Sequence, residues 1–102
     1  MTNRKVGDVI FQGTDEEIAY SMTTTNWGSD PTDVVVKAYD ISSASRVDVT
    51  ATVLSGSASV TGDVITLPKL KALTAGTPYR IEVKFTSGGN IYEPYVVVIG
   101  EY

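Results

Sequence analysis

The chain of 102 residues contains no cysteine and no histidine. Without cysteine it can form neither a disulfide nor a thiolate metal site. Without histidine it lacks the usual general base near neutral pH and the commonest metal ligand of proteins. The fold must therefore be held by its core alone. A domain of this size can do so, because it buries roughly 60–70% of the surface that its unfolded chain exposes.

Basic residues and long apolar runs are scarce as well. Eight Lys and Arg residues against 12 Asp and Glu residues give a net charge of −4. Affinity for nucleic acid depends largely on Lys and Arg that neutralise phosphates, so we expect no nucleic-acid partner. The apolar run over residues 96–99 has the length of a strand and is too short to span a bilayer or to form a signal-peptide core. We expect a soluble protein that is made in the cytosol and has no membrane partner.

Motifs for catalysis or metal binding are missing too. The sequence holds no phosphate loop, dinucleotide fingerprint or metal-ligand spacing. The acidic run over residues 15–17 is typical of a solvated loop. Asp30 and Asp33 could offer oxygens to calcium, but they lack the regular spacing of a calcium loop, and the intervening Pro31 favours a turn. We therefore expect no enzymatic activity, no cofactor, no bound metal and no small-molecule substrate.

What the chain has instead is apolar residues that recur with a period of two, separated by clusters of Gly, Pro, Asn, Asp and Ser. This pattern is typical of strands and turns. It predicts strands over residues 8–12, 17–22, 33–40, 46–54, 57–61, 64–67, 79–86 and 91–99. In the fourth of these strands, the residues expected to point inward are Val47, Val49, Ala51 and Val53. Residues 69–73 could form one helical turn.

The segment over residues 73–79 has the pattern of a tyrosine corner. Leu73, a turn containing Gly76, and Tyr79 at the start of an alternating strand are the elements of this motif, whose ring is buried and whose hydroxyl bonds to nearby backbone. The sequence therefore predicts an all-β fold, an immunoglobulin-like or fibronectin-III-like antiparallel β-sandwich of seven to eight strands. One domain would span residues 1–102, with an N-terminal arm over residues 1–8 and a C-terminal tail over residues 100–102.

Two of the predicted strands, residues 33–40 and 91–99, carry apolar residues on both faces. A strand with one face in water should alternate cleanly. In such a sandwich the two strands flank residues 79–86, so their surplus apolar residues fall on the outer face of one sheet: Val35, Tyr39, Tyr95 and Val97. Three interpretations stay open: a protein-binding face, a face covered by loops or a tail, and ordinary strand propensity. Pro94 indicates that its own strand lies at a sheet edge, to which another chain could add.

Trp27, the sole tryptophan, lies in the predicted loop between the second and third strands. It could close the open end of the sandwich, which is the interpretation that we favour. Alternatively, its exposed ring could stack on a sugar or anchor a protein partner.

Across residues 9–100 the order of these features resembles that of small phage virion proteins, the phage fibre–tail adaptor family. The resemblance rests on residues 18–22, Trp27 and residues 33–40, and then on residues 57–67, 73–81 and 85–90. It implies a structural protein of a virion, made in the cytoplasm of a bacterial host, whose partners are other virion proteins and copies of itself. Residues 1–8 and 100–102 would be docking segments that become ordered on assembly. The alternatives are a carbohydrate- or surface-binding module that uses Trp27, and an immunoglobulin-like repeat of a larger surface protein.

Overall fold

The computed structural model describes residues 4–102 as two layers of strands. One layer is a six-stranded sheet, ordered β1 (Ile10–Gly13), β11 (Tyr95–Glu101), β9 (Pro78–Ser87), β3 (Thr32–Asp40) and β4 (Val47–Asp48), with β10 (Asn90–Tyr92) paired to the end of β9. The other layer contains β2 (Ser21–Thr23), β7 (Val64–Thr66) and β6 (Ser59–Thr61), together with the pair β5 (Leu54–Ser55) and β8 (Lys69–Leu70). The prediction of an all-β chain is confirmed.

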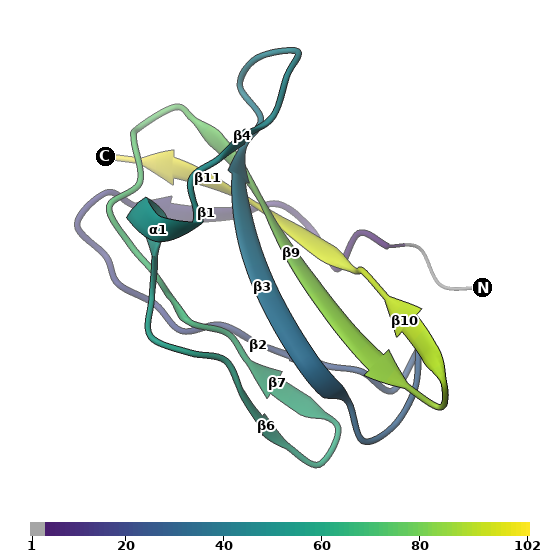
Figure 1. Cartoon of the computed structure of the whole chain (residues 1–102). Coiled ribbons are helices and arrows are strands. Elements are labelled where there is room, and N and C mark those ends of the chain that lie inside the picture. The colour runs from purple at the N-terminus through teal and green to yellow at the C-terminus, as the bar shows by residue number, and fades with distance from the viewer. Residues whose placement is uncertain (1–3) are drawn as a thin grey trace.

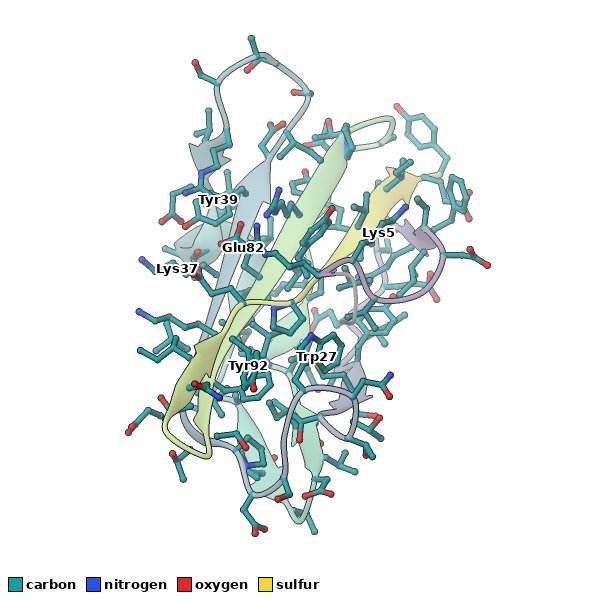
Figure 2. The ribbon with its side chains drawn as sticks, turned by 90° about the vertical axis from the view of Figure 1, so that its right-hand side faces the viewer. Lys5, Trp27, Lys37, Tyr39, Glu82 and Tyr92 are labelled. Carbon is teal, nitrogen blue, oxygen red and sulfur yellow. The ribbon has the colours of Figure 1, made fainter. Side chains whose placement is uncertain are left out.

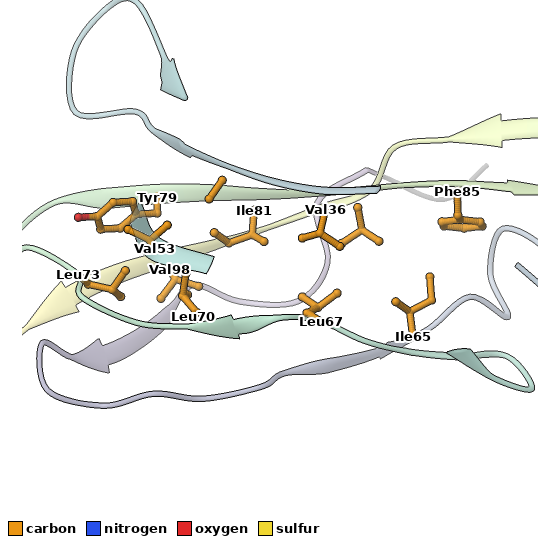
Figure 3. Packing of buried hydrophobic residues seen from close by; sticks show 12 residues of the cluster. Val36, Val53, Ile65, Leu67, Leu70, Leu73, Tyr79, Ile81, Phe85 and Val98 are labelled. Carbon is orange, nitrogen blue, oxygen red and sulfur yellow. The ribbon is translucent and has the colours of Figure 1, made fainter. Parts of the chain in front are cut away.

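The core lies between the two layers, as Figure 3 shows. Along β9, Tyr79, Ile81, Val83 and Phe85 are each no more than 4% exposed, because alternate residues of a strand point to the same face. The facing layer contributes another set of buried residues: Ile65, Leu67, Leu70 and Leu73. The remaining buried apolar residues are Val36, Ala38, Val53 and Val98.

Tyr79 has the contacts of a tyrosine corner. Its side chain is 4% exposed, and its hydroxyl accepts a hydrogen bond of 2.9 Å from the backbone N–H of Thr74. Gly76 has a φ of 79°, a conformation that a residue with a Cβ adopts only under strain. The N–H of Gly76 donates to the carbonyl of Gly100 at 2.8 Å. The corner therefore ties the turn before β9 to the end of β11.

Replacing Tyr79 with phenylalanine should lower the free energy of unfolding by about 1–2 kcal/mol, because the N–H of Thr74 loses its acceptor. Urea denaturation measures the change. Tyr92→Phe is the matched control, since the Tyr92 hydroxyl has only a long hydrogen bond, 3.3 Å, from the exposed Asn90 amide. Equal losses in the two variants would contradict a specific role for the Tyr79 hydroxyl.

The predicted strand over residues 46–54 is wrong. It is divided into β4, the single helical turn α1 (Thr50–Val53) and β5. Val47 is 54% exposed and Val53 is 2% exposed. The other two residues expected to point inward are a half-buried Val49 and an exposed Ala51. The four residues therefore do not share one buried face, as they would in a single continuous strand.

Side-chain hydrogen bonds explain the break after β4. The carboxylate of Asp48 accepts a 2.9 Å hydrogen bond from the backbone N–H of Thr50, and this contact lowers the pKa of Asp48. The hydroxyl of Thr50 in turn accepts a 3.0 Å hydrogen bond from the N–H of Ala38 in β3. The local bond to Asp48 offers the backbone an alternative to a strand ladder, and the bond to Ala38 fixes Thr50 against β3.

The helical turn predicted over residues 69–73 is also wrong, since Lys69 and Leu70 form β8 and pair with β5. The described residues form 11 strands rather than seven or eight, and several are only two or three residues long. The predicted hairpin around Gly62 and Asp63 is confirmed, because Thr61 pairs with Val64 across these two residues.

Residues 91–99 form two strands, β10 and β11, separated by Glu93 and Pro94. The expectation that β11 has a free edge is wrong. Its outer side pairs in parallel with β1 and with Lys5. The backbone of Tyr95 donates to the carbonyl of Arg4 at 2.8 Å and accepts from the N–H of Val6 at 2.7 Å.

The two expected docking segments differ from the prediction. Residues 4–6 already lie against β11 within the single chain. The prediction that they become ordered only on assembly is therefore wrong. Residues 1–3 lie outside the described residues. At the other end, β11 includes Gly100 and Glu101, so the tail beyond it is Tyr102 alone.

Candidate protein-binding face

The candidate site is the outer face, by which we mean the surface of the six-stranded sheet that points away from the core (Figure 2). Strand register sets its rows of side chains. Across β3, β9 and β11, one row consists of Tyr39, Arg80 and Val97, and the next consists of Lys37, Glu82 and Tyr95. Residues that are paired across antiparallel strands have their side chains on the same face, so the members of each row are neighbours.

Glu82 is the centre of an ion-pair network on this face. The residue is 8% exposed, although it belongs to the outward-pointing set of β9. Its Oε2 atom lies 2.8 Å from Nε of Arg80, 3.0 Å from Nη1 of Arg46 and 4.0 Å from Nη2 of Arg4. Only the Arg46 contact has the angles of a hydrogen bond, and Nε of Arg80 makes a close ion pair without them. Three guanidinium groups thus surround one largely buried carboxylate.

The same arginines stack on the tyrosines of the outer face. The guanidinium carbon of Arg80 lies 3.9 Å from the centroid of the Tyr95 ring, and that of Arg4 lies 5.6 Å from the same centroid. Arg46 lies 4.1 Å from the centroid of the Tyr39 ring. Cation–π attraction and the ion pairs act together to hold these long side chains in place.

The four residues predicted for this face do lie on it, but they do not form one patch. Val35 is 47% exposed, and the other three are half-buried. The charged side chains of β9 separate Val35 and Tyr39 on β3 from Tyr95 and Val97 on β11. The arginine side chains also cover part of the apolar surface, as their amphipathic stems allow.

Sequence reasoning missed the apolar neighbours of Val97. Phe11 on β1 is paired with Ile99 on β11, and it is 59% exposed. Ile99 follows Val97 at a spacing of two, so it points to the same face. The signal available in the sequence was the adjacent pair of Ile10 and Phe11, which gives β1 an apolar residue on each face.

The outer face is also basic, although the whole chain is acidic. It carries six of the eight Lys and Arg residues: Arg4, Lys5, Lys37, Arg46, Arg80 and Lys84. Its acidic residues are Asp48, Glu82, Glu93 and Glu101. A groove of about 200 Å³ between β3 and Glu93 is lined by five charged side chains together with Val35 and Tyr39. Such a surface fits another macromolecule better than a small molecule, whose sites are enclosed and mostly apolar.

Trp27 lies away from this face. It is half-buried and packs against the core cluster, as Tyr92 also does. Its loop is closed by the backbone carbonyl of Thr24, which accepts hydrogen bonds from Trp27 at 2.9 Å and Gly28 at 2.8 Å. This packing favours the interpretation of Trp27 as a plug, and a sugar-binding role stays a prediction.

The acidic residues considered for metal binding are dispersed in residues 4–102, where no group of three or more Asp or Glu side chains could hold an ion. The backbone N–H of Asp30 bonds to a carboxylate oxygen of Asp63 at 3.1 Å. In the acidic run over residues 15–17, Glu16 accepts a 2.7 Å hydrogen bond from the N–H of Gly13. Over the same described part of the chain, no helix has the length and apolar character needed to cross a membrane.

Comparison with known proteins does not assign the chain to a family. Neither a scan against protein families nor a search of curated proteins finds a match to this chain. The resemblance to phage virion proteins therefore stays a prediction.

Proposed function

We propose that the chain is an immunoglobulin-like sandwich that serves as a non-enzymatic structural protein of a phage virion. It would join or decorate virion parts as a tail or fibre adaptor, a neck component or a capsid decoration protein. The strand order β1-β11-β9-β3-β4 facing β2-β7-β6, with a buried tyrosine at the turn before β9, supports the sandwich assignment. The order of sequence features supports the virion role.

The composition and order of the outer face carry the proposal of a protein contact. Tyr and Arg are the residue types that dominate binding energy in protein interfaces. Here Tyr39 and Tyr95 are held under arginines, and the arginines are held by Glu82. Side chains that are ordered before binding lose less conformational entropy when a partner arrives. Exposed Val35 and Phe11 flank this ordered centre and add apolar area.

Charge indicates which partners fit. A basic outer face on a chain of net charge −4 leaves the rest of the surface acidic. The outer face of one copy therefore suits an acidic surface, either on another virion protein or elsewhere on a second copy. A contact between two different surfaces of identical copies produces a ring when its rotation closes. Such a contact should weaken as salt is added, because exposed charges are screened.

The proposal is tested on particles. Virions purified from the source of this chain should contain it at a fixed ratio to the major capsid protein, as measured by quantitative mass spectrometry. Its absence from purified particles would remove the virion role, while leaving the fold and the outer face unaffected.

The contact surface has its own test. The double variant Phe11→Asp, Val97→Asp should weaken self-association or binding to the virion partner at least about tenfold, which corresponds to ~1.4 kcal/mol. Phe11 is exposed and the half-buried Val97 lies on the outer face, outside the core, so the double variant should stay folded. Val60→Asp is the matched control, since Val60 is 42% exposed on the opposite layer. Sedimentation velocity at low and high salt gives the measurement. Identical sedimentation of wild type, double variant and control would contradict the outer face as the contact.

A sugar-binding module remains the competing function, because the ring of Trp27 is only half-buried and aromatic rings stack on sugars. A glycan screen with the intact chain separates the two functions. Binding that is lost in Trp27→Ala and retained in Val97→Asp would favour the sugar-binding module over the virion contact.

A further inference from the structure

An apolar cleft of about 280 Å³ opens between residues 6–8 and strand β2. Its lining includes Ile10, Tyr20, Met22 and Val96, together with the buried residues Leu67 and Val83. Leu67 is 5% exposed and Val83 is 2% exposed, so the cleft reaches the core between the two layers. Atoms that line an unfilled apolar space lose the dispersion contacts that a close-packed core provides. An apolar group that entered the cleft would restore those contacts.

The strand beside the cleft has an open edge. Among residues 4–102, β2 pairs with β7 and with no other strand. Tyr20 accepts a 2.7 Å hydrogen bond from Leu67, and Thr24 donates a 2.8 Å hydrogen bond to Asp63, so these two residues face β7. Because bonding alternates along an antiparallel pair, the N–H and C=O groups of Ser21 and Thr23 point away from β7. They present the hydrogen-bonding pattern that an added strand requires.

The charge at the cleft indicates which side chains a bound segment should carry. Asp8 is exposed, and it is the one charged residue among those that line the cleft. A basic side chain on the occupant would therefore find a partner at this position, whereas an acidic one would be repelled. The volume of about 280 Å³ lies at the lower limit of ligand sites, which typically span roughly 300–1,000 Å³. It suits one large side chain rather than a whole ligand.

We propose that the cleft and the edge of β2 together bind an extended segment of another protein. The segment adds as a strand beside β2, through hydrogen bonds to Ser21 and Thr23. It inserts one large apolar side chain over Leu67 and Val83, and it places a Lys or Arg residue beside Asp8. In strand addition of this kind the backbone supplies affinity and the pocket supplies specificity. The site lies at the edge of the three-stranded sheet. Tyr95 also lines the cleft, but the other outer-face residues do not, so variants at Phe11 and Val97 leave the cleft unchanged.

The probe for this site is a synthetic peptide, Lys-Thr-Leu-Thr-Val-Thr-Lys, capped at both ends and added to the full chain. We expect slower hydrogen exchange at the amides of Ser21 and Thr23, together with shifts of the Met22 and Val83 methyl signals. A peptide with Asp in place of each Lys should bind more weakly. Methyl shifts without protection of the two amides would overturn strand addition in favour of a pocket for small apolar molecules. Absence of both effects would overturn the site itself.

Two variants test the mechanism of binding. Ser21→Pro removes an outward-pointing N–H while leaving the bonds of Tyr20 and Thr24 to β7, so peptide affinity should fall at least about tenfold. Val60→Pro is the matched control, because it alters the far edge of the same sheet, on β6. Equal binding by the two variants would count against the edge of β2.

The second variant, Val96→Phe, fills the cleft from β11. It should abolish binding of the peptide without lowering the unfolding temperature, since added apolar volume enters empty space. Retained binding would show that the cleft does not hold the side chain. The outer-face double variant should bind the peptide like wild type, so failure of this site and failure of the proposed function are distinguishable.

Discussion

Gly100→Ala is expected to lower the free energy of unfolding by about 3 kcal/mol, the upper part of the range for overpacking. A Cβ at this position would overlap the carbonyl oxygen of Thr74, and it would lie 3.0 Å from the carbonyl carbon and 3.2 Å from Cβ of Leu73. The main obstacle is backbone, so no rotamer change relieves it. Gly100 cannot retreat either, because it donates to the carbonyl of Thr77 at 3.1 Å and accepts from Gly76 at 2.8 Å.

Thermal and urea unfolding measure the effect of Gly100→Ala. A loss of this size should lower the unfolding temperature by roughly 12–24 °C in a domain of about 100 residues. Gly13→Ala is the matched control in the neighbouring strand β1. Its Cβ would meet the Oε1 and Cγ atoms of Glu16 at 3.1 and 3.3 Å, and that side chain can move aside. Similar losses in the two variants would contradict the close approach of β11 to the tyrosine corner.

The local pattern predicted the parts of the fold that local chemistry controls. Alternation identified β9, the Val-rich run over residues 33–40 identified β3, and the two-residue turn at Gly62 and Asp63 identified the hairpin of β6 and β7. The tyrosine at the start of β9 was identified as buried because a Leu, a turn containing Gly and a Tyr have few other uses in that order. In each case the determining residues lie within one turn or one strand.

Alternation failed where a side chain far along the chain determines the backbone. In residues 46–54 the valines alternate as in a strand, but the hydroxyl of Thr50 bonds to Ala38 on β3, and the N–H of Thr50 donates to Asp48 where the helical turn begins. Pro94 indicated an edge, and that edge is filled by residues 4–6 from the other end of the chain. A period of two reports which residues alternate, and it carries no information on which distant segment pairs with them.

At the candidate site, too, sequence patterns predicted the features set by neighbouring residues and missed those set by distant residues. Surplus apolar residues on two strands indicated an unusual outer face. However, its ordered centre depends on contacts between Glu82 and two residues far away in sequence, Arg46 and Arg4. A buried polar residue was missed for the same reason. Gln12 is fully buried on β1, and its amide donates to the carbonyl of Leu70 at 2.7 Å, which links the two layers. Nothing within a few positions of these residues marks them.

Glu82→Ala is expected to lower the free energy of unfolding by about 2 kcal/mol. Removing the carboxylate leaves three guanidinium groups close together without their anion, and breaking a fully buried pair typically costs roughly 3–5 kcal/mol. The expected loss is smaller here because the side chains of Arg4 and Arg46 are each 54% exposed, so solvent screens their repulsion. The side chain of Arg80 is 25% exposed and contributes most of the effect.

A double-mutant cycle with Arg80→Met separates this ionic effect from lost packing. If the ion pair dominates, Glu82→Ala should cost much less in the Arg80→Met background, with a coupling of about 1–2 kcal/mol. The same loss in both backgrounds would contradict the network. Glu82→Gln keeps the shape of the side chain and removes its charge, so it should release the arginines from their fixed positions while the strands stay paired. Because those arginines lie over Tyr39 and Tyr95, the Gln variant should also dissociate faster from a partner of the outer face, which links the stability of this sheet to its proposed function.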